Sequence, residues 1–158
     1  MKLWDKGTPV NKAIEDFTVG KDRELDLYLA PYDILGSMAH ITMLESVGLI
    51  EKEELPVLLE ELKHLYKKAV AGDFVIDDGV EDVHSQVEFL LINKLGDLGK
   101  KIHTARSRND QVLVATNLYL KEEVNAIKKT VIELFDLLMQ LAEQHQKILL
   151  PGYTHLQV

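Results

Sequence analysis

The sequence contains no cysteine, which excludes a disulfide framework, a thiolate metal site and a cysteine nucleophile. It also lacks any apolar run long enough for a membrane span or for the core of a signal peptide. Acidic residues outnumber basic ones by 26 to 18, so the excess of positive charge that attracts nucleic acids and anionic membranes is missing. We therefore expect a cytoplasmic protein without a nucleic-acid or membrane partner.

Glycine and proline are scarce, and stretches of alternating apolar and polar residues are absent, so the sequence predicts an all-α fold. Apolar residues recur at helical spacing over 32–49, 51–70 and 82–95. Pro31 is expected to interrupt the preceding segment, whereas Gly48 and Gly72 are expected to end the first two helices. Residues 73–81 are interpreted as an acidic connector, and Gly96 and Gly99 as breaks in the chain.

The longest pattern begins after Asn109, where neither glycine nor proline occurs before Pro151. Six apolar residues there fall seven positions apart: Leu113, Leu120, Ile127, Leu134, Leu141 and Ile148. This spacing predicts a helix of about 40 residues, which is about 60 Å at 1.5 Å per residue. The preceding helices are too few and too short to cover it. We therefore expect it to pack in a helical bundle or an oligomer.

The segment Lys101–Gln111, KIHTARSRNDQ, stands immediately before this helix and is the strongest candidate site. Ser107, Arg108 and Asn109 would lie at the helix start, where unpaired N–H groups and the positive end of the dipole favour an anion. Arginine can also hold a carboxylate with two parallel hydrogen bonds. We therefore expect recognition of a small carboxylate. The alternative is that Ser107 or Asn109 only caps the helix and the arginines are solvated.

Two further segments carry histidines that could take part in chemistry. The chain ends in PGYTHLQV, where Thr154 and His155 follow a helix-breaking Pro-Gly pair; histidine suits proton transfer near neutral pH. His84 lies near the start of the helix expected over 82–95. In isolation, the first segment is equally explained as a surface turn, and His84 as a capping or packing residue. No pair of the six histidines has the spacing of metal ligands on one helix face, so no metal site is expected.

Several of these segments together resemble the N-terminal third of the argininosuccinate lyase family, within the fumarase and aspartase superfamily. The matching segments are KLW at 2–4, PYDILGSMAH at 31–40, LESVGLI at 44–50, EDVHSQVE at 81–88, GKKIHTARSRNDQV at 99–112 and PGYTHLQ at 151–157. The combination of HTARSRNDQ with GYTHLQ is specific to this family within the superfamily. The resemblance covers essentially the whole chain.

The resemblance implies cleavage of argininosuccinate to arginine and fumarate, with no metal or organic cofactor. It implies that His155 is the catalytic histidine, and that Ser107, Arg108, Asn109, Thr154 and His84 bind substrate. Arg106 and Gln157 are expected to support them. Members of the family are homotetramers with active sites built from several subunits. By this resemblance, residues 1–106 form a small N-terminal helical domain, and 107–158 begin the central long-helix bundle.

The chain also departs from the family pattern. The family's mobile serine loop, of the form GSSxMPxKxNP, does not occur in it, so the general base is not assigned, and we expect an incomplete and inactive fragment. Gly20 stands where many relatives have a substrate-contacting serine. Two alternatives remain: another lyase of the superfamily (adenylosuccinate lyase, aspartase or fumarase), or a non-enzymatic, crystallin-like helical oligomer.

Overall fold

The computed structural model describes residues 14, 17, 20–149, 151–155 and 157. These residues form helices and no strand, apart from an isolated bridge between Thr154 and Gln157, which confirms the all-α prediction. The chain divides into two compact units, Met1–Leu120 and Lys121–Val158, which are described separately below. The domain boundary expected between residues 106 and 107 stays a prediction.

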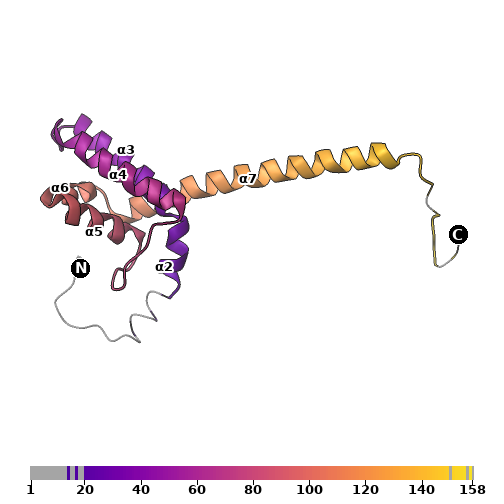
Figure 1. Ribbon diagram of the computed structural model, residues 1–158, viewed down its shortest axis with the longest axis horizontal. Coiled ribbons are helices and arrows are strands. Elements are labelled where there is room, and N and C mark those ends of the chain that lie inside the picture. The colour runs from indigo at the N-terminus through magenta and orange to yellow at the C-terminus, as the bar shows by residue number, and fades with distance from the viewer. Residues whose placement is uncertain (1–13, 15–16, 18–19, 150, 156, 158) are drawn as a thin grey trace. The chain divides into compact units, whose positions relative to one another are not determined.

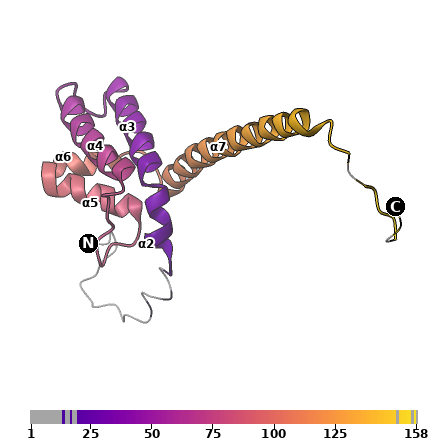
Figure 2. The same ribbon diagram turned by 45° about the vertical axis from the view of Figure 1, so that its right-hand side comes forward.

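The first unit is built around two long helices, α3 (Ala30–Ser46) and α4 (Glu54–Ala71), which lie side by side (Figures 1 and 2). The preceding helical segment ends before Pro31, as expected, and Pro31 lies in the first turn of α3. Proline is tolerated there since the first N–H groups of a helix need no partner within it. The preceding segment is short and irregular, with α2 (Asp22–Leu25) and a 3₁₀ turn, η1 (Asp26–Tyr28).

The predicted helix ends at Gly48 and Gly72 are confirmed. Gly72 follows α4 with φ +78°, and its N–H donates to the carbonyl oxygen of Ala69 at 3.2 Å. Gly48 follows α3 with φ +76°, and its N–H donates to the carbonyl oxygen of Glu45 at 2.9 Å. Both glycines adopt the left-handed backbone conformation that ends many helices, and that residues with a side chain rarely adopt.

The next helix, α5 (Val83–Leu95), contacts both α3 and α4 and completes the core. The acidic connector before it is not merely a solvated loop, because its apolar residues Phe74, Ile76 and Val80 are buried in that core. The buried amide of Gln86 fastens the connector to α5: it accepts from the N–H of Asp77 at 3.0 Å and donates to the Asp77 carboxylate at 2.8 Å. The helical core residues are Ile34, Ile41 and Leu44 of α3; Leu58, Leu62 and Leu65 of α4; and Val83, Val87 and Leu91 of α5.

The short helix α6 (Asp97–Lys100) links α5 to the candidate segment, which begins with a 3₁₀ turn, η2 (Lys101–His103). Gly96 ends α5 with φ +63°, as expected. Gly99 was expected to break the chain, but it lies within α6 and packs closely on α5. A Cβ atom at Gly99 would lie 2.5 Å from the carbonyl carbon and oxygen of Leu91, so the sequence needs glycine here for close approach.

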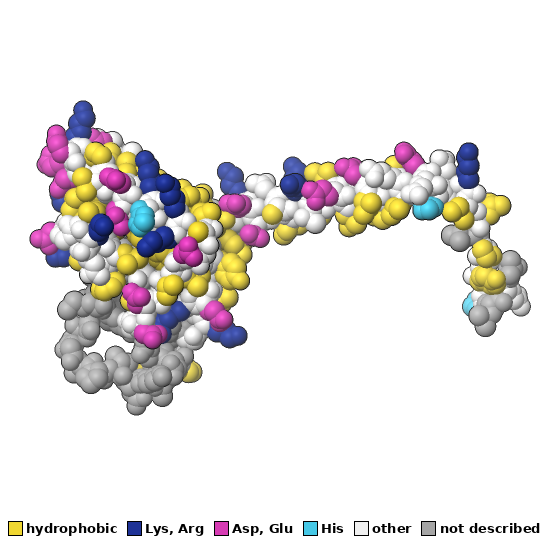
Figure 3. Space-filling view, in the orientation of Figure 1, with side chains coloured by type: hydrophobic (Ala, Val, Ile, Leu, Met, Phe, Trp, Pro, Cys, Tyr) yellow, Lys and Arg dark blue, Asp and Glu magenta, His cyan; other side chains and the backbone are white. Residues whose placement is uncertain are grey.

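The long helix predicted near the C-terminus is α7 (Arg108–His145), 38 residues in length. In the first unit its early turns bury Gln111 and Ala115. In the second unit every residue from 121 to 149 is exposed, and apolar side chains gather along one side of this part of the helix (Figure 3). We call Val124, Ile127, Val131, Leu134, Leu138 and Leu141 the apolar seam. Among the described residues, no helix has the combined length and apolar character that a membrane crossing requires.

Candidate active site

Ser107 caps the start of α7. Its hydroxyl accepts from the N–H of Asp110 at 3.3 Å, and the Ser107 N–H donates to the Asp110 carboxylate at 2.9 Å. This reciprocal pairing is a capping box. The backbone hydrogen bond from Ser107 and then the one from its hydroxyl lower the pKa of Asp110. Ser107 therefore caps α7, as the alternative stated. The substrate-binding role of Ser107 stays a prediction.

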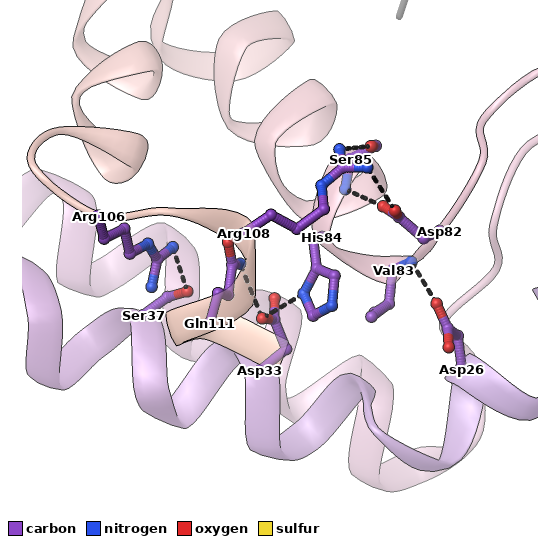
Figure 4. Close-up of polar contacts among 10 residues, drawn as sticks. All are labelled: Asp26, Asp33, Ser37, Asp82, Val83, His84, Ser85, Arg106, Arg108 and Gln111. Atoms are coloured by element: carbon purple, nitrogen blue, oxygen red, sulfur yellow. Dashed lines mark hydrogen bonds and ion pairs between the residues drawn. The ribbon is translucent and has the colours of Figure 1, made fainter. Parts of the chain in front are cut away.

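Arg108 joins the start of α7 to the start of α5 (Figure 4). One guanidinium nitrogen, Nη1, lies 2.9 Å from Asp82 Oδ2, and the other, Nη2, donates to the hydroxyl of Ser85 at 2.9 Å. Asp82 also caps α5 by accepting from the N–H of Ser85 at 2.8 Å. The Arg108 side chain thus carries a positive charge from the start of α7 to the start of α5, where the N-terminal end of α5 also favours an anion. Asn109, on the same first turn, is exposed.

His84 lies in the first turn of α5 and points into the protein, where only 7% of its surface is exposed. Its Nδ1 lies 2.7 Å from Asp33 Oδ1, and the side-chain amide of Gln111 donates to the same oxygen at 2.7 Å. This contact engages Nδ1 and leaves Nε2 as the second ring atom able to serve a ligand. Asp33 therefore ties α3, α5 and α7 together.

Arg106 supports the same region from the segment between η2 and α7. Its Nη2 donates to the hydroxyl of Ser37, a fully buried residue of α3, at 3.0 Å. Burial lowers the pKa of Arg106, while the nearby negative charges of Asp33 and Glu88 act in the opposite direction. The residue before it, Ala105, has φ +57°, a conformation that an L-residue adopts only at some cost. This turn directs Arg106 inward.

Sequence reasoning missed Asp33, Ser37 and Gln111 as members of this cluster. Asp33 and Ser37 continue the buried row that Ile41 and Leu44 occupy on α3, since 33, 37, 41 and 44 share one helical face. A polar residue at a position that helical spacing places on the buried apolar face could have been recognised in the sequence. Gln111 ends the candidate segment Lys101–Gln111, but its burial against Asp33 was not predicted.

Thr154 and His155 belong to the second unit and are described on their own. The N–H of Thr154 donates to the carbonyl oxygen of Gln157 at 2.9 Å, and the N–H of Gln157 donates back at 3.0 Å. Between them the chain turns tightly, with His155 at φ +51° and its side chain exposed. Gln157 thus supports this turn through its backbone. Their predicted roles in catalysis and substrate binding stay predictions.

No group of three or more His, Cys, Asp or Glu residues within the described part of the chain has an arrangement suited to a metal ion. A carboxylate placed at the start of α5 would meet the Arg108 guanidinium. Asp82 already neutralises part of that charge, so such a ligand would share Arg108 with it.

Comparison with known proteins identifies the family. The family model described as Lyase matches residues 6–158. The chain is 59% identical over 157 residues to the argininosuccinate lyase of Bacteroides fragilis, covering 99% of this chain and 35% of that protein. It is 44% identical over 154 residues to the argininosuccinate lyase of Thermotoga neapolitana, covering 98% of this chain and 39% of that protein. The chain thus spans about a third of the length of these relatives. Because the family match covers nearly every residue, the chain belongs to the Lyase family.

Proposed function

We propose that this chain supplies part of the active site of an enzyme that cleaves argininosuccinate into arginine and fumarate, a step of arginine biosynthesis. The observation that carries the proposal is the 59% identity, over 157 residues, to a protein named argininosuccinate lyase. The position of Arg108, whose guanidinium is held at the start of α5, supports it, because the substrate and its intermediate carry carboxylates that a cation near a helix start favours.

The proposed reaction is an elimination. A base removes a proton from the carbon next to a carboxylate of the succinyl group, and the resulting carbanion is held as an aci-carboxylate. The bond from the neighbouring carbon to the guanidinium nitrogen then breaks, a carbon–carbon double bond forms, and an acid returns a proton to the departing nitrogen. Fixed donors must stabilise the charge on the carboxylate as the carbanion develops.

We assign that stabilisation to Ser107, Arg108 and Asn109 at the start of α7. Arg108 is held in place by Asp82 and Ser85, so its guanidinium needs little reorganisation when a carboxylate arrives. His84 contributes through Nε2, since its Nδ1 is engaged by Asp33. Thr154 contacts the substrate, and His155 acts in acid–base chemistry or in orienting it. The general base is supplied by residues outside this chain.

We further propose that the enzyme is a homotetramer, in which copies of α7 cover one another's apolar seam. Six large apolar side chains of the seam are between 41% and 62% exposed in the single chain, which is a costly surface to leave in water. A cytoplasmic location accords with the complete lack of cysteine.

A chimeric enzyme tests the substrate. Residues 2–158 of this chain would replace the matching segment of the Bacteroides fragilis protein, and ultraviolet absorbance would follow fumarate release. The substrates would be argininosuccinate, adenylosuccinate, aspartate and malate, each of which yields fumarate by elimination. We expect release from argininosuccinate alone. Release from another substrate would favour a different lyase of the superfamily. If the chimera assembles but releases fumarate from none of the four substrates, while the unaltered relative is active, the result would favour a non-enzymatic helical oligomer.

A further inference from the structure

Asp33 and His84 form a buried pair within the first unit. Only 1% of Asp33 and 7% of His84 are exposed, and Oδ1 of Asp33 lies 2.7 Å from Nδ1 of the imidazole ring. Nε2, the other ring nitrogen, makes no hydrogen bond to another described residue. One side of the ring is therefore fixed by the protein, and the other is open to a ligand.

Asp33 is itself held firmly in place. The side-chain amide of Gln111 donates to the same oxygen, Oδ1, at 2.7 Å, and the charge of the buried Arg106 interacts with that of the carboxylate. Burying a charged group adds little net stability in many proteins, because the loss of hydration offsets the attraction to its partners. Orienting His84 would give this buried carboxylate a use that an apolar side chain could not replace.

His84 stands between two residues that hold Arg108 (Figure 4). Asp82 precedes it by two positions and lies 2.9 Å from one guanidinium nitrogen, and Ser85 follows it and accepts from the other at 2.9 Å. All three residues are at the start of α5. The orientation of the His84 ring therefore matters at the place where the proposed function puts a carboxylate of the substrate.

On the basis of the proposed function, we infer that Asp33 is a positioning residue, which accepts a hydrogen bond from Nδ1 of His84 and presents Nε2 to the substrate. An ionised carboxylate only accepts hydrogen bonds, so the neutral ring keeps its proton on Nδ1 and its lone pair on Nε2. The hydrogen bond made by one ring nitrogen determines which nitrogen carries the proton. Asp33 touches neither the substrate nor the reacting atoms, and it acts through His84.

Nuclear magnetic resonance of this chain tests the tautomer without any turnover. At a pH at which the ring is neutral, the chemical shifts of the two ring nitrogens show which of them carries the proton. The signal of His84 is identified by its loss in His84→Asn. We expect the proton on Nδ1. A neutral ring with the proton on Nε2 would overturn the inference, whatever the enzyme's substrate proves to be.

Kinetics of the chimeric enzyme test the positioning role. Asp33→Asn is nearly isosteric but removes the charge and replaces one oxygen with a donor, so the ring is held less firmly. We expect kcat/KM for argininosuccinate to fall on the order of 100-fold, since small displacements of a group at the site can cost this much. Ile41→Val, which alters the same buried face of α3 outside the polar cluster, is the control and should leave kcat/KM unchanged.

A second pair of chimeras separates positioning from a merely structural role. In His84→Asn the amide nitrogen can take the place of Nδ1 and keep the bond to Asp33, but nothing takes the place of Nε2. Adding Asp33→Asn to this slower chimera should lower kcat/KM little further, because the two residues act as one unit. A fall of the same size with and without His84 would overturn the inference, as would an unchanged rate for Asp33→Asn alone.

Failure of the proposed function would be recognised separately. It would appear as an assembled chimera, without these substitutions, that releases no fumarate from argininosuccinate. The proton position on His84 would then decide whether Asp33 holds Nδ1 as a donor. The same measurement decides the matter if Asp33→Asn fails to fold.

Discussion

Asp33 is the residue on which the polar interior of the first unit depends. One carboxylate oxygen receives hydrogen bonds from both His84 and Gln111, and the carboxylate also attracts the buried Arg106. These contacts join three helices through one side chain. Removing one member of such a buried network leaves the others unpaired, which is more costly than losing the hydrogen bonds themselves.

His40 makes stability depend on pH. Burial lowers its pKa below the usual 6.5, and the positive charges of Arg106 and His103 lower it further, while the hydrogen bond to the carbonyl oxygen of Thr104 opposes them. Below pH 6.5 the unfolded chain therefore binds more protons at this position than the folded chain. His40 thus contributes stability above that pH, and the contribution is lost as the pH falls toward the lower, folded-state pKa.

We predict that, as the pH falls from about 7 to 5, the free energy of unfolding decreases less for His40→Gln than for the unsubstituted chain. The glutamine side chain can still donate to the carbonyl oxygen of Thr104. Urea denaturation at a series of pH values measures this difference in the free energy of unfolding. His64→Gln, at an exposed position of α4, serves as the control and should follow the unsubstituted chain. Parallel curves for His40→Gln and the unsubstituted chain would contradict the account.

The residues of the site were predictable from the sequence to different degrees. Ser107, Arg108 and Asn109 were expected at a helix start because polar residues preceded a long apolar repeat, and that placement is confirmed. The partners of Arg108 were not predictable, since Asp82 and Ser85 lie more than twenty positions away in the sequence. Tertiary contacts of this kind depend on how helices pack, which spacing alone does not determine.

At the scale of elements, helical periodicity predicted α3, α4, α5 and α7 because each carries apolar residues along one face, which is buried in the first three and exposed along most of α7. The error arose at glycine, whose effect depends on context. Gly99 permits α6 to approach α5 where a break was expected. Glycine has more than one structural use, and the sequence pattern did not distinguish between them.

The start of α7 combines a structural role with a proposed binding role for Ser107, and these can be separated. Ser107→Ala removes the cap and should lower the free energy of unfolding by about 1 kcal/mol. Ser107→Asn should lose little stability, because asparagine is among the best N-cap residues. Chemical denaturation of the three chains measures the cap.

The binding role is measured in the chimeric enzyme. If the Ser107 hydroxyl contacts the substrate, Ser107→Asn should slow fumarate release from argininosuccinate even though its stability is retained. An unchanged rate for Ser107→Asn would mean that Ser107 serves only as a cap. Ser46→Ala, at the exposed end of α3, is the control for substituting a serine outside the site.

At the scale of the whole molecule, the described residues leave a large apolar helix surface uncovered. The apolar seam of α7 is exposed along its length, and the opposite side of the helix carries the charged residues Glu122, Lys129, Asp136 and Glu143. The sequence predicted the length and the heptad pattern of this helix. What covers the seam was not predictable, because the apolar pattern of one helix does not identify the residues that pack against it.

We predict that the seam drives self-association. Leu134→Asp places a charge in the seam and should shift the chain to monomers, measured as a fall in molar mass by light scattering. Asp136→Asn, two residues away on the charged side, should leave the molar mass unchanged. Equal molar masses for Leu134→Asp and the unsubstituted chain would show that the seam is not the surface of association.

The most direct test of the central claim is fumarate release from argininosuccinate by this chain alone, and by this chain mixed with the remaining two thirds of the Bacteroides fragilis relative. We predict no release by the chain alone and release on mixing, because the proposed active site is shared between the two segments. Release by the chain alone, at a rate comparable with the intact relative, would contradict the account. The account would also be contradicted if the two segments co-purify as one assembly and the mixture releases no fumarate.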